Sequence, residues 1–591
     1  MYLKCHAAIL AVSLMPQIAI ATELDIKYDV KSNLLSNSSP ARYISKAEIE
    51  ATNANSLAEL LQKTTSFTVY SLGTKTSKTN IRAFGLEDEH VLILLNGSPL
   101  TNVTEGEAQL EWIDLATVQG IEYFSLGEGV VFGSGSAGAV INIITGGNSV
   151  KDHVTINSGT HNLRGFTVAK GLELNASNIS IVASYQASSG YDSQPASQPD
   201  NDGFKTGSST ISWTSKDLSA GLNSIDLSTS STTNEIDNGR LDQNLVDTEI
   251  TSMRIAGKLN NALSYSIDRS ELSTTAYNSD ASSKNIYTSD NSGINLVSNY
   301  LRNFKFGAEY RQTNYSPGGD AYYALADEQS LFGLFASANT QLMSIGKVSG
   351  SLRGEEHSTN GFQSAANLNI ELPSETGASS KVTLARSYRY PTLADKAQYD
   401  LSWAVSDYNQ NLQPEKVSMI AFEYLWPIQV GWIRSKAYRT KTQDFISISQ
   451  ANEGGASSTG LEVSAEFLLG ALHQNITLSL VKTAVEKYSD TAMAYTPDRQ
   501  LNYRAEYPCL GGLISLDLHG QSKMYTNYNE QSNYLLSGYA IADVGFSRKF
   551  SDINVRANLA NAFDKDRVLY SGSKSYALPG REFEIELRYE F

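Results

Sequence analysis

Gly133, Gly135 and Gly138 have the spacing G-x-G-x-x-G. That spacing binds the pyrophosphate of a dinucleotide when it joins a strand to a helix inside a βαβ unit. Here the strand-like segment 139–145 (AVINIIT) follows instead of a helix, and no acidic residue stands where it would hold a ribose. We therefore reject a dinucleotide site and attribute the glycines to tight turns and close backbone packing.

The 7 histidines are scattered along the chain and suggest no catalytic centre. Glu355-Glu356-His357 lacks a second histidine at metal-ligand spacing, and His90 opens an apolar segment in which a structural hydrogen bond is expected. No Ser-His-Asp or Cys-His arrangement for nucleophilic catalysis is recognisable. We therefore expect a protein that is not an enzyme, so its function must come from the elements that position its polar residues.

The last eleven residues, 581–591 (REFEIELRYEF), alternate between apolar and charged side chains. Because strand side chains alternate faces, one face would be wholly apolar and aromatic and the other wholly charged. Lipid outside and water inside a transmembrane barrel require this pattern, and a strand of about 9–11 residues crosses the bilayer. The segment is therefore predicted to be a membrane-spanning strand.

Similar alternating segments, such as 179–186 (ISIVASYQ) and 381–388 (KVTLARSY), fill the chain from about residue 154 onward. Beyond residue 21 there is no apolar run near 18 residues, and the mean hydropathy is -0.27, which excludes a helical membrane protein. About 440 residues at roughly 20 per strand and turn predict about 22 antiparallel strands, and barrels of that width have a plugged lumen. The predicted fold class is an all-β transmembrane barrel over residues 148–591.

Residues 33–147 differ in kind and are predicted to form an α+β plug domain inside that lumen. Ser45 and Glu48 have the spacing of a helix capping box, and leucines follow at helical spacing. The near-continuous apolar run 90–97 (HVLILLNG) indicates a strand buried on both faces.

Residues 1–21 have the layout of a cleaved secretory signal: Lys4, an apolar run, and an A-x-A site that ends at Ala21. An N-terminal membrane anchor is the alternative, for which the apolar run is short. After cleavage Cys509 is the only one of the 2 cysteines left, so no intrachain disulfide can form. The net charge of -16 argues against nucleic acid as a partner. We expect a monomer surrounded by outer-membrane lipid.

The order of motifs resembles that of TonB-dependent outer-membrane receptors over nearly the whole mature chain. In the plug, the resemblance rests on 80–100 (NIRAFGLEDEHVLILLNGSPL) and 112–145. In the barrel, it rests on the paired mid-barrel signatures 387–393 (SYRYPTL) and 409–416 (NQNLQPEK), and on the C-terminal box 576–591. Ala83 and Asn96 depart from the family pattern, which more often has glycine and aspartate there.

The resemblance implies a receptor that TonB, with its inner-membrane energising complex, activates through a short N-terminal box. In the N-terminal segment 22–32 the box would lie at residues 24–30, namely Leu24, Asp25, Ile26, Lys27, Tyr28, Asp29 and Val30. The segment matches the family pattern poorly, but pairing by β-strand addition tolerates sequence variation. The alternative is a plain flexible tail.

Within the family the chain is most similar to the cobalamin receptors, which bind structural Ca²⁺ on extracellular loops. The resemblance implies calcium ligands in SSGYD (188–192), SQPDNDGF (197–204) and the next hairpin: Asp192, Gln198, Asp200, Asp202, Asp237 and Asp247. Ca²⁺ takes about 6–8 oxygen ligands, and crowded carboxylates would repel one another without it. The alternative is a solvated polar loop, since Asp-Asn-Asp-Gly is also ordinary turn sequence.

The same resemblance implies active import of a scarce small molecule, cobalamin above all, that binds at the plug apices. The matching positions are Thr76 and Lys78 on the first apex and Glu105 and Gly106 on the second. A ferric-siderophore receptor on the same scaffold is the main alternative, and a non-transporting binding protein or passive pore is a weaker one. Haem transport is disfavoured, because 394–408 has no histidine where the family's haem receptors carry one.

Overall fold

The computed structural model describes residues 41–591 except for short gaps in the loops and at a few single positions. These gaps are 72, 101, 103, 107–109, 147–149, 196–199, 218–220, 237–243, 278–283, 302, 320–324, 343–345, 375, 400–404, 447–450, 453, 489–490, 528–534 and 572–573. The expected signal segment 1–21 and the expected TonB box at 24–30 therefore lie outside the described residues.

Twenty-two antiparallel strands of the described chain form a closed barrel, which confirms the predicted fold class. Each strand pairs with its neighbours in sequence order, and the last strand pairs with the first, Glu584 opposite Gly159, to close the ring. The barrel strands are β8 (His153–Gly159), β9 (Arg164–Glu173), β10 (Ser177–Tyr191), β11 (Asp202–Ser215), β12 (Gly221–Ile236), β13 (Asn244–Asn260), β14 (Leu263–Tyr277), β15 (Lys284–Leu301), β16 (Phe304–Gly319), β17 (Asp327–Leu342), β18 (Gly346–His357), β19 (Gly361–Pro373), β20 (Ser379–Arg389), β23 (Glu415–Ile428), β24 (Gly431–Gln443), β25 (Gly455–Leu469), β26 (Leu472–Val485), β27 (Arg499–Cys509), β28 (Gly512–Gln521), β31 (Tyr539–Phe550), β32 (Ile553–Ala560) and β35 (Glu582–Glu590).

The two faces of the barrel wall follow the alternation of the sequence. In β35 the apolar side chains from Phe583 to Phe591 are exposed on the outer surface, while Arg588, between two of them, is buried against the plug. A closed sheet leaves no unpaired edge in the bilayer, so its backbone groups are satisfied within the wall. No helix in the described part of the chain is long and apolar enough to cross a membrane.

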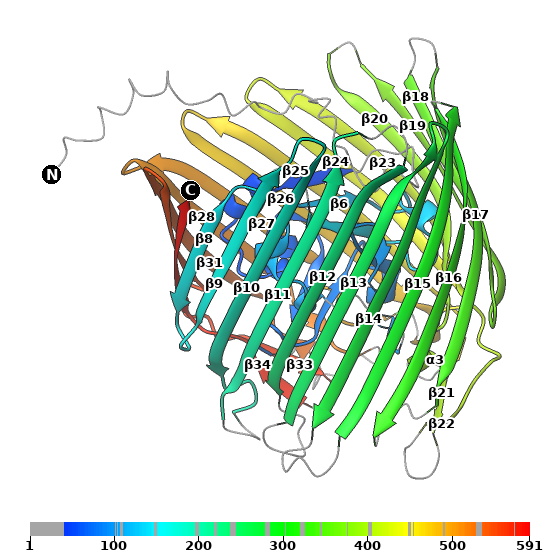
Figure 1. Ribbon diagram of the computed structural model, residues 1–591, viewed down its shortest axis with the longest axis horizontal. Coiled ribbons are helices and arrows are strands. Elements are labelled where there is room, and N and C mark those ends of the chain that lie inside the picture. The colour runs from blue at the N-terminus through cyan, green and yellow to red at the C-terminus, as the bar shows by residue number, and fades with distance from the viewer. Residues whose placement is uncertain are drawn as a thin grey trace.

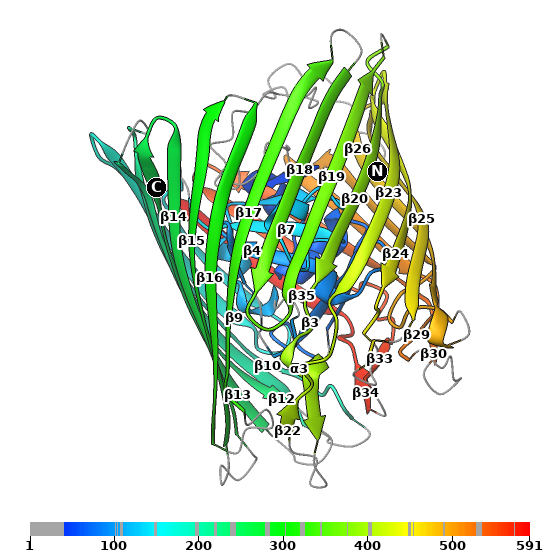
Figure 2. The same cartoon turned by 90° about the vertical axis from the view of Figure 1, so that its right-hand side faces the viewer.

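The two ends of the barrel differ in the length of their connections. One end has short turns, and the other has long loops that contain elements of their own (Figures 1 and 2). Outer-membrane barrels place short turns in the periplasm and long loops outside the cell, which orients the molecule. The loop elements are α3 (Leu393–Lys396), β21 (Ala397–Tyr399), β22 (Val405–Tyr408), η8 (Glu486–Tyr488), β29 (Met524–Tyr525), β30 (Leu535–Leu536), β33 (Val568–Ser571) and β34 (Lys574–Ala577).

The plug is a small α+β unit that lies inside the ring of strands in both views (Figures 1 and 2). Its five-stranded sheet has the order β1-β6-β7-β4-β5, and a separate β2–β3 hairpin reaches toward the extracellular end. The plug elements are β1 (Arg42–Ser45), α1 (Lys46–Ala51), α2 (Leu57–Thr64), β2 (Thr68–Ser71), β3 (Thr79–Arg82), η4 (Asp88–His90), β4 (Val91–Leu95), β5 (Ser98–Pro99), η5 (Leu110–Trp112), η6 (Leu115–Thr117), β6 (Gly120–Phe124), η7 (Val130–Phe132) and β7 (Ala139–Ile144).

Local sequence explains the plug elements. The Ser45 hydroxyl accepts a hydrogen bond from the backbone N–H of Glu48 and caps α1, as the sequence predicts. The helical region is divided in two near Asn53, whose φ of 50° lies in the left-handed region, and Ser56 caps the second helix. Strand β4 is buried along its whole length, as predicted for the 90–97 run, because it pairs with β5 and β7 and packs on both faces.

Candidate substrate site

A cavity of about 370 Å³ lies between the plug apices and the inner wall of the barrel near the extracellular end. The β2–β3 hairpin and the loop after β5 provide its plug side, and β11 to β16 provide most of its barrel side. Three of the four residues predicted to contact substrate line it together, and the fourth, Gly106, follows directly after one of them. Its lining includes Thr76, Lys78, Glu105, Asp202, Asn234, Tyr287, Tyr315 and Tyr576.

The first apex is docked on the barrel through Thr76. Its hydroxyl donates a hydrogen bond to the Oδ1 atom of Asn234 on β12, and the Asn234 side-chain amide donates to the Thr76 carbonyl at 2.8 Å. Both residues are buried, so this reciprocal pair is shielded from water. Beside it, the Lys75 ammonium donates to the side-chain oxygen of Gln186 on β10 at 2.6 Å. The apex is therefore held at two points of the wall.

The second apex is joined to the first and to an extracellular loop. The Lys78 ammonium and the Glu105 carboxylate lie 2.8 Å apart and link the two apices. The Ala394 backbone N–H in α3 donates to the Thr104 carbonyl at 2.7 Å. At Gly106 a Cβ would lie 2.4 Å from the Thr392 methyl group, and φ is +73°, so glycine is required at this close approach.

The lining of the cavity is rich in carboxylates and phenol rings. In the described part of the lining, Lys78 is the one cationic side chain, against the four carboxylates of Glu105, Glu111, Asp202 and Glu235. Tyr287, Tyr315 and Tyr576 face it from β15, β16 and β34. Sequence reasoning missed these tyrosines because they come from segments up to 289 residues apart that only the closed barrel brings together. The arrangement suits a large ligand with many hydrogen-bonding groups and no strong negative charge.

The predicted calcium ligands separate into two groups. Asp192, Asp200 and Asp202 lie close enough to influence one another electrostatically: burial raises the pKa of Asp192, the Gln194 N–H opposes this, and the Asp200 carboxylate raises it further. The Asp200 Oδ1 atom is buried without a hydrogen-bond partner among the described residues. No three acidic, histidine or cysteine side chains in the described ranges stand close enough together to hold a metal ion. Gln198 and Asp237 lie outside the described residues.

Asp247 is not brought to this loop. On β13 its neighbours Val246 and Thr248 both line the cavity, so the side chain of Asp247 points to the opposite face of the wall. There its carboxylate accepts a hydrogen bond from the Thr233 hydroxyl at 2.7 Å. The spacing of aspartates in the sequence could not reveal this, because a shift of one residue along a strand changes the face.

The two mid-barrel signatures meet at a buried ion pair that also touches the plug. Arg389 and Glu415 are opposite one another in the β20–β23 register, and their side chains form two hydrogen bonds of 3.0 and 3.1 Å. The Nε2 atom of His90 in the plug lies 2.7 Å from Oε2 of Glu415, the same oxygen that accepts from the Nε of Arg389. This confirms the structural hydrogen bond expected for His90.

Two family models match this chain. The TonB-dependent receptor plug domain matches residues 33–140, and the TonB-dependent receptor-like β-barrel matches residues 143–562, well over half of the chain. The chain belongs to the TonB-dependent receptor family. It is therefore an outer-membrane protein, in agreement with its closed 22-stranded barrel. Its relatives in this family are receptors and transporters.

Among curated relatives, the vitamin B12 transporter BtuB of Vibrio cholerae serotype O1 is 23% identical over 599 residues, which cover 93% of this receptor and 92% of BtuB. Among solved structures, a mutant of the ferric enterobactin receptor PfeA from Pseudomonas aeruginosa has a TM-score of 0.77 at 15% identity and covers 95% of this chain and 100% of its own. The copper transporter OprC has a TM-score of 0.76 at 14% identity, covering 91% and 96%. At these identities the structural likeness shows the fold alone.

At the periplasmic end of the receptor, three barrel arginines hold the C-terminal end of α1. Arg504 on β27 donates to the carbonyls of Ala51 and Thr52, the latter at 3.2 Å. Arg556 on β32 donates to the Glu50 carbonyl at 2.9 Å, and Arg588 on β35 pairs with the Glu50 carboxylate. These carbonyls are the ones a helix leaves unpaired at its C-terminus, where positive charge is favourable. We call Arg504, Arg556 and Arg588 the arginine clamp.

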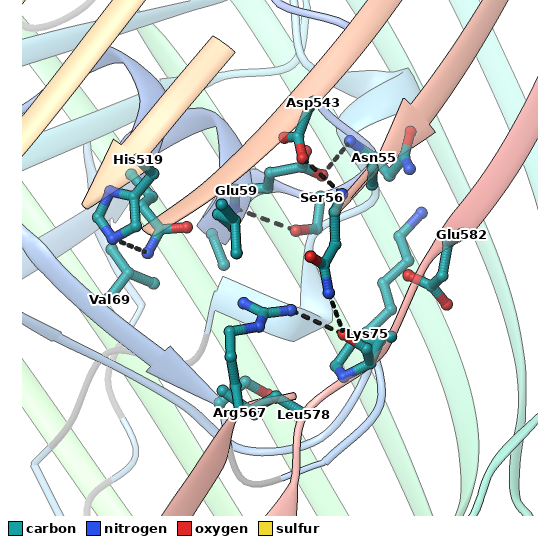
Figure 3. A pocket seen from close by; sticks show the side chains of 18 of the residues that line it. Asn55, Ser56, Glu59, Val69, Lys75, His519, Asp543, Arg567, Leu578 and Glu582 are labelled. Carbon is teal, nitrogen blue, oxygen red and sulfur yellow. Dashed lines mark hydrogen bonds between the residues drawn. The ribbon is translucent and has the colours of Figure 1, made fainter. Parts of the chain in front are cut away.

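A second cavity of the receptor, about 280 Å³, separates α2 and the β2–β3 hairpin from the barrel wall around β28, β31 and β35. Figure 3 shows Glu59 and Lys75 of the plug on the same cavity as Asp543, Arg567 and Glu582 of the barrel. In it the Lys63 ammonium lies 2.7 Å from Glu59 and 3.1 Å from Asp543. On this side the plug and barrel therefore meet through charged side chains around a hollow.

Proposed function

We propose that this receptor actively imports cobalamin across the outer membrane, with energy supplied by TonB. The observation that carries the proposal is the charge of the extracellular cavity: among the described residues Lys78 is its only cation and is paired with Glu105, while Glu111, Asp202 and Glu235 add negative charge. Cyanocobalamin is a large uncharged corrin edged with amide groups, which such carboxylates and tyrosine hydroxyls can bind. The whole-length similarity to a vitamin B12 transporter supports the same substrate.

We propose Ca²⁺ as a structural ion on the loop that closes this cavity. Asp192, Asp200 and Asp202 provide hard oxygen ligands, and the unpartnered Oδ1 atom of Asp200 is the kind of atom that a cation satisfies. A bound cation would also oppose the burial, and the smaller repulsion from Asp200, that raise the pKa of Asp192. Gln198 and Asp237 would complete the set, and Asp247, which faces the other side of the wall, would not.

We propose that TonB pairs with residues 24–30 and pulls on the plug. The described chain begins close to β1 and α1, so tension on the N-terminal segment would reach the β1–β6 pairing first and then the arginine clamp. A plug inside a barrel of this width is useful to a transporter in which passage of the substrate is gated and requires energy. The presence of the plug therefore argues against a passive pore.

A ferric-siderophore receptor remains the second candidate, because Trp112 and the three tyrosines give the cavity aromatic surfaces. Ferric catecholates carry net negative charge, so they would bind beside carboxylates only with additional cations. The charge of the lining therefore favours cobalamin between the two.

The deciding experiment is titration of the purified full-length receptor in detergent with cyanocobalamin, in Ca²⁺ and in a chelator. We expect tight binding that the chelator weakens, and we expect Asp202→Asn to weaken it roughly tenfold, which corresponds to about 1.4 kcal/mol. Asp247→Asn is the matched control, since its carboxylate faces away from the cavity, and it should bind as the unmodified receptor does. Binding of ferric enterobactin but not cyanocobalamin would replace the proposal with the siderophore alternative.

A further inference from the structure

A shallow groove of about 630 Å³ lies on the outer surface of the barrel, over β18, β19, β20, β23 and β24. These strands lie side by side and face the viewer in Figure 2. The groove is unrelated to the substrate cavity, because its exposed side chains point away from the lumen. It contains both aliphatic and cationic side chains and no acidic one among the described residues.

Three cations form the part of the groove nearer the long-loop end: Arg386 on β20, and Arg439 and Lys441 on β24. Each lies between residues that face inward, because Ser387, Tyr438, Thr440 and Thr442 are all buried. The three cations therefore point outward. The strand register places them together. Ser418 on β23 is opposite Arg386 on one side and opposite Lys441 on the other. Arg439 is opposite Ile420, two residues further along β23. In the described part of the chain none of the three forms an ion pair.

The rest of the groove is aliphatic. Leu368, Leu384 and Ile420 share one register row, and Leu352 stands on β18 beside it; Leu352 is 64% exposed and Ile420 51%. Ser418 is small and stands between the cationic side chains of its two neighbouring strands, so the wall is hollow at its position. A ligand seated here would meet hydrocarbon on one side and positive charge on the other.

The cations mark the extracellular boundary of the lipid-facing band. On β23 the outward residues are apolar and aromatic from Trp426 to Ile420 and then polar at Ser418, toward the long-loop end. Arg386 lies three residues before the end of β20, at the same boundary. The groove thus spans the level at which lipid headgroups of the outer leaflet meet acyl chains.

Strand β14, six strands before β20 in the barrel, shows a different use of an outward arginine. Arg269 on β14 lies 2.5 Å from Asp290 and 3.7 Å from Glu271, so its charge is neutralised within the protein. Charges on a lipid-facing surface are costly when nothing compensates them. Three adjacent uncompensated cations at the headgroup level therefore call for an external anion.

We propose that this groove binds an anionic, phosphate-rich lipid of the outer leaflet. The guanidinium groups of Arg386 and Arg439 offer the paired donors that match phosphate oxygens, and Lys441 adds a third charge. The acyl chains of this lipid lie over Leu352, Leu368, Leu384 and Ile420, toward the middle of the membrane. The aliphatic half of the groove distinguishes this ligand from a soluble anion, which would gain nothing from it.

The test is native mass spectrometry of the full-length receptor in detergent, with diphosphoryl lipid A as the probe. We expect one retained lipid on the unmodified receptor and at least tenfold less on the triple variant Arg386→Gln/Arg439→Gln/Lys441→Gln. Arg269→Gln, which removes an outward arginine that already has acidic partners, should retain the lipid. Ser418→Trp keeps every charge but fills the hollow, and it should lose the lipid as well.

Heat-modifiable migration on a gel identifies which variants form the barrel, so Ser418→Trp decides the matter if the triple variant does not fold. Equal retention by a folded triple variant would overturn the proposal. Equal retention of phosphatidylethanolamine would overturn it too, because the cations would then not select phosphate-rich headgroups. Full displacement of the lipid by millimolar inorganic phosphate would assign the groove to a soluble anion instead.

Discussion

At the scale of single residues, Glu415 is the point at which plug and barrel depend most on one side chain. It is fully buried, and its two oxygens accept from His90, from Arg389 and from the Ile446 backbone N–H at 2.7 Å. Removing one partner of a buried ion pair costs roughly 3–5 kcal/mol, because the other charge is left uncompensated. We expect Glu415→Gln to speed amide hydrogen exchange in β4 of the plug strongly, measured by mass spectrometry on the purified receptor.

The neighbouring residue offers a matched control. Lys416 is paired with Asp444 at 3.3 Å, and both side chains are partly exposed, so this pair contributes about 1 kcal/mol or less. Lys416→Gln should therefore leave exchange in β4 unchanged. Unchanged exchange in Glu415→Gln as well would show that plug packing, without the ion pair, holds β4 in place.

At the scale of elements, the arginine clamp explains how a six-residue helix stays fixed at the periplasmic mouth. Short helices are marginal on their own, so α1 depends on its tertiary contacts. We expect the double variant Arg504→Gln/Arg556→Gln to speed hydrogen exchange in α1, while cyanocobalamin affinity on the extracellular side stays the same. Arg548→Gln is the control, because Arg548 donates to a periplasmic turn, the Leu510 carbonyl at 2.8 Å, and not to the plug. An α1 that exchanges no faster would mean that its apolar packing suffices.

Lys46 adds to this anchoring at the other end of α1. Its ammonium donates to the Val118 carbonyl at 2.8 Å, and burial lowers its pKa to about 8. Burying an ammonium costs free energy unless it is hydrogen-bonded. The hydrogen bond from Lys46 to Val118 offsets this cost while α1 is in place. The helix is thus held from both ends, from the plug sheet and from the barrel.

Most elements could be predicted from the sequence because they depend on local patterns. Period-2 alternation predicts the strands, and Ser45 and the apolar run at residues 90–97 predict plug elements that the structure contains. The contacts between distant strands could not be predicted in this way. The outward direction of Asp247, the tyrosines of the cavity and the arginine clamp all follow from register and closure, which a single sequence does not specify.

At the scale of the whole molecule, the receptor consists of a plug and a barrel that meet through many polar contacts and around several cavities. One such contact joins the Ser136 hydroxyl of the plug to the Ser387 hydroxyl of β20, whose oxygens lie 3.3 Å apart and are buried. If transport requires the plug to move against this wall, a covalent bond here should block it. A binding site at the apices would be untouched.

We therefore predict that Ser136→Cys/Ser387→Cys, once oxidised, binds cyanocobalamin normally but does not import it, and that a reductant restores uptake of the radiolabelled vitamin by cells. Thiol titration of the purified variant measures how much disulfide has formed. The matched control, Ser464→Cys/Thr477→Cys, joins two barrel strands whose hydroxyls lie 3.2 Å apart and should import in either redox state. Import by the fully oxidised plug–barrel variant would mean that the transport path opens elsewhere. The plug and barrel would then separate at the charged cavity beside α2.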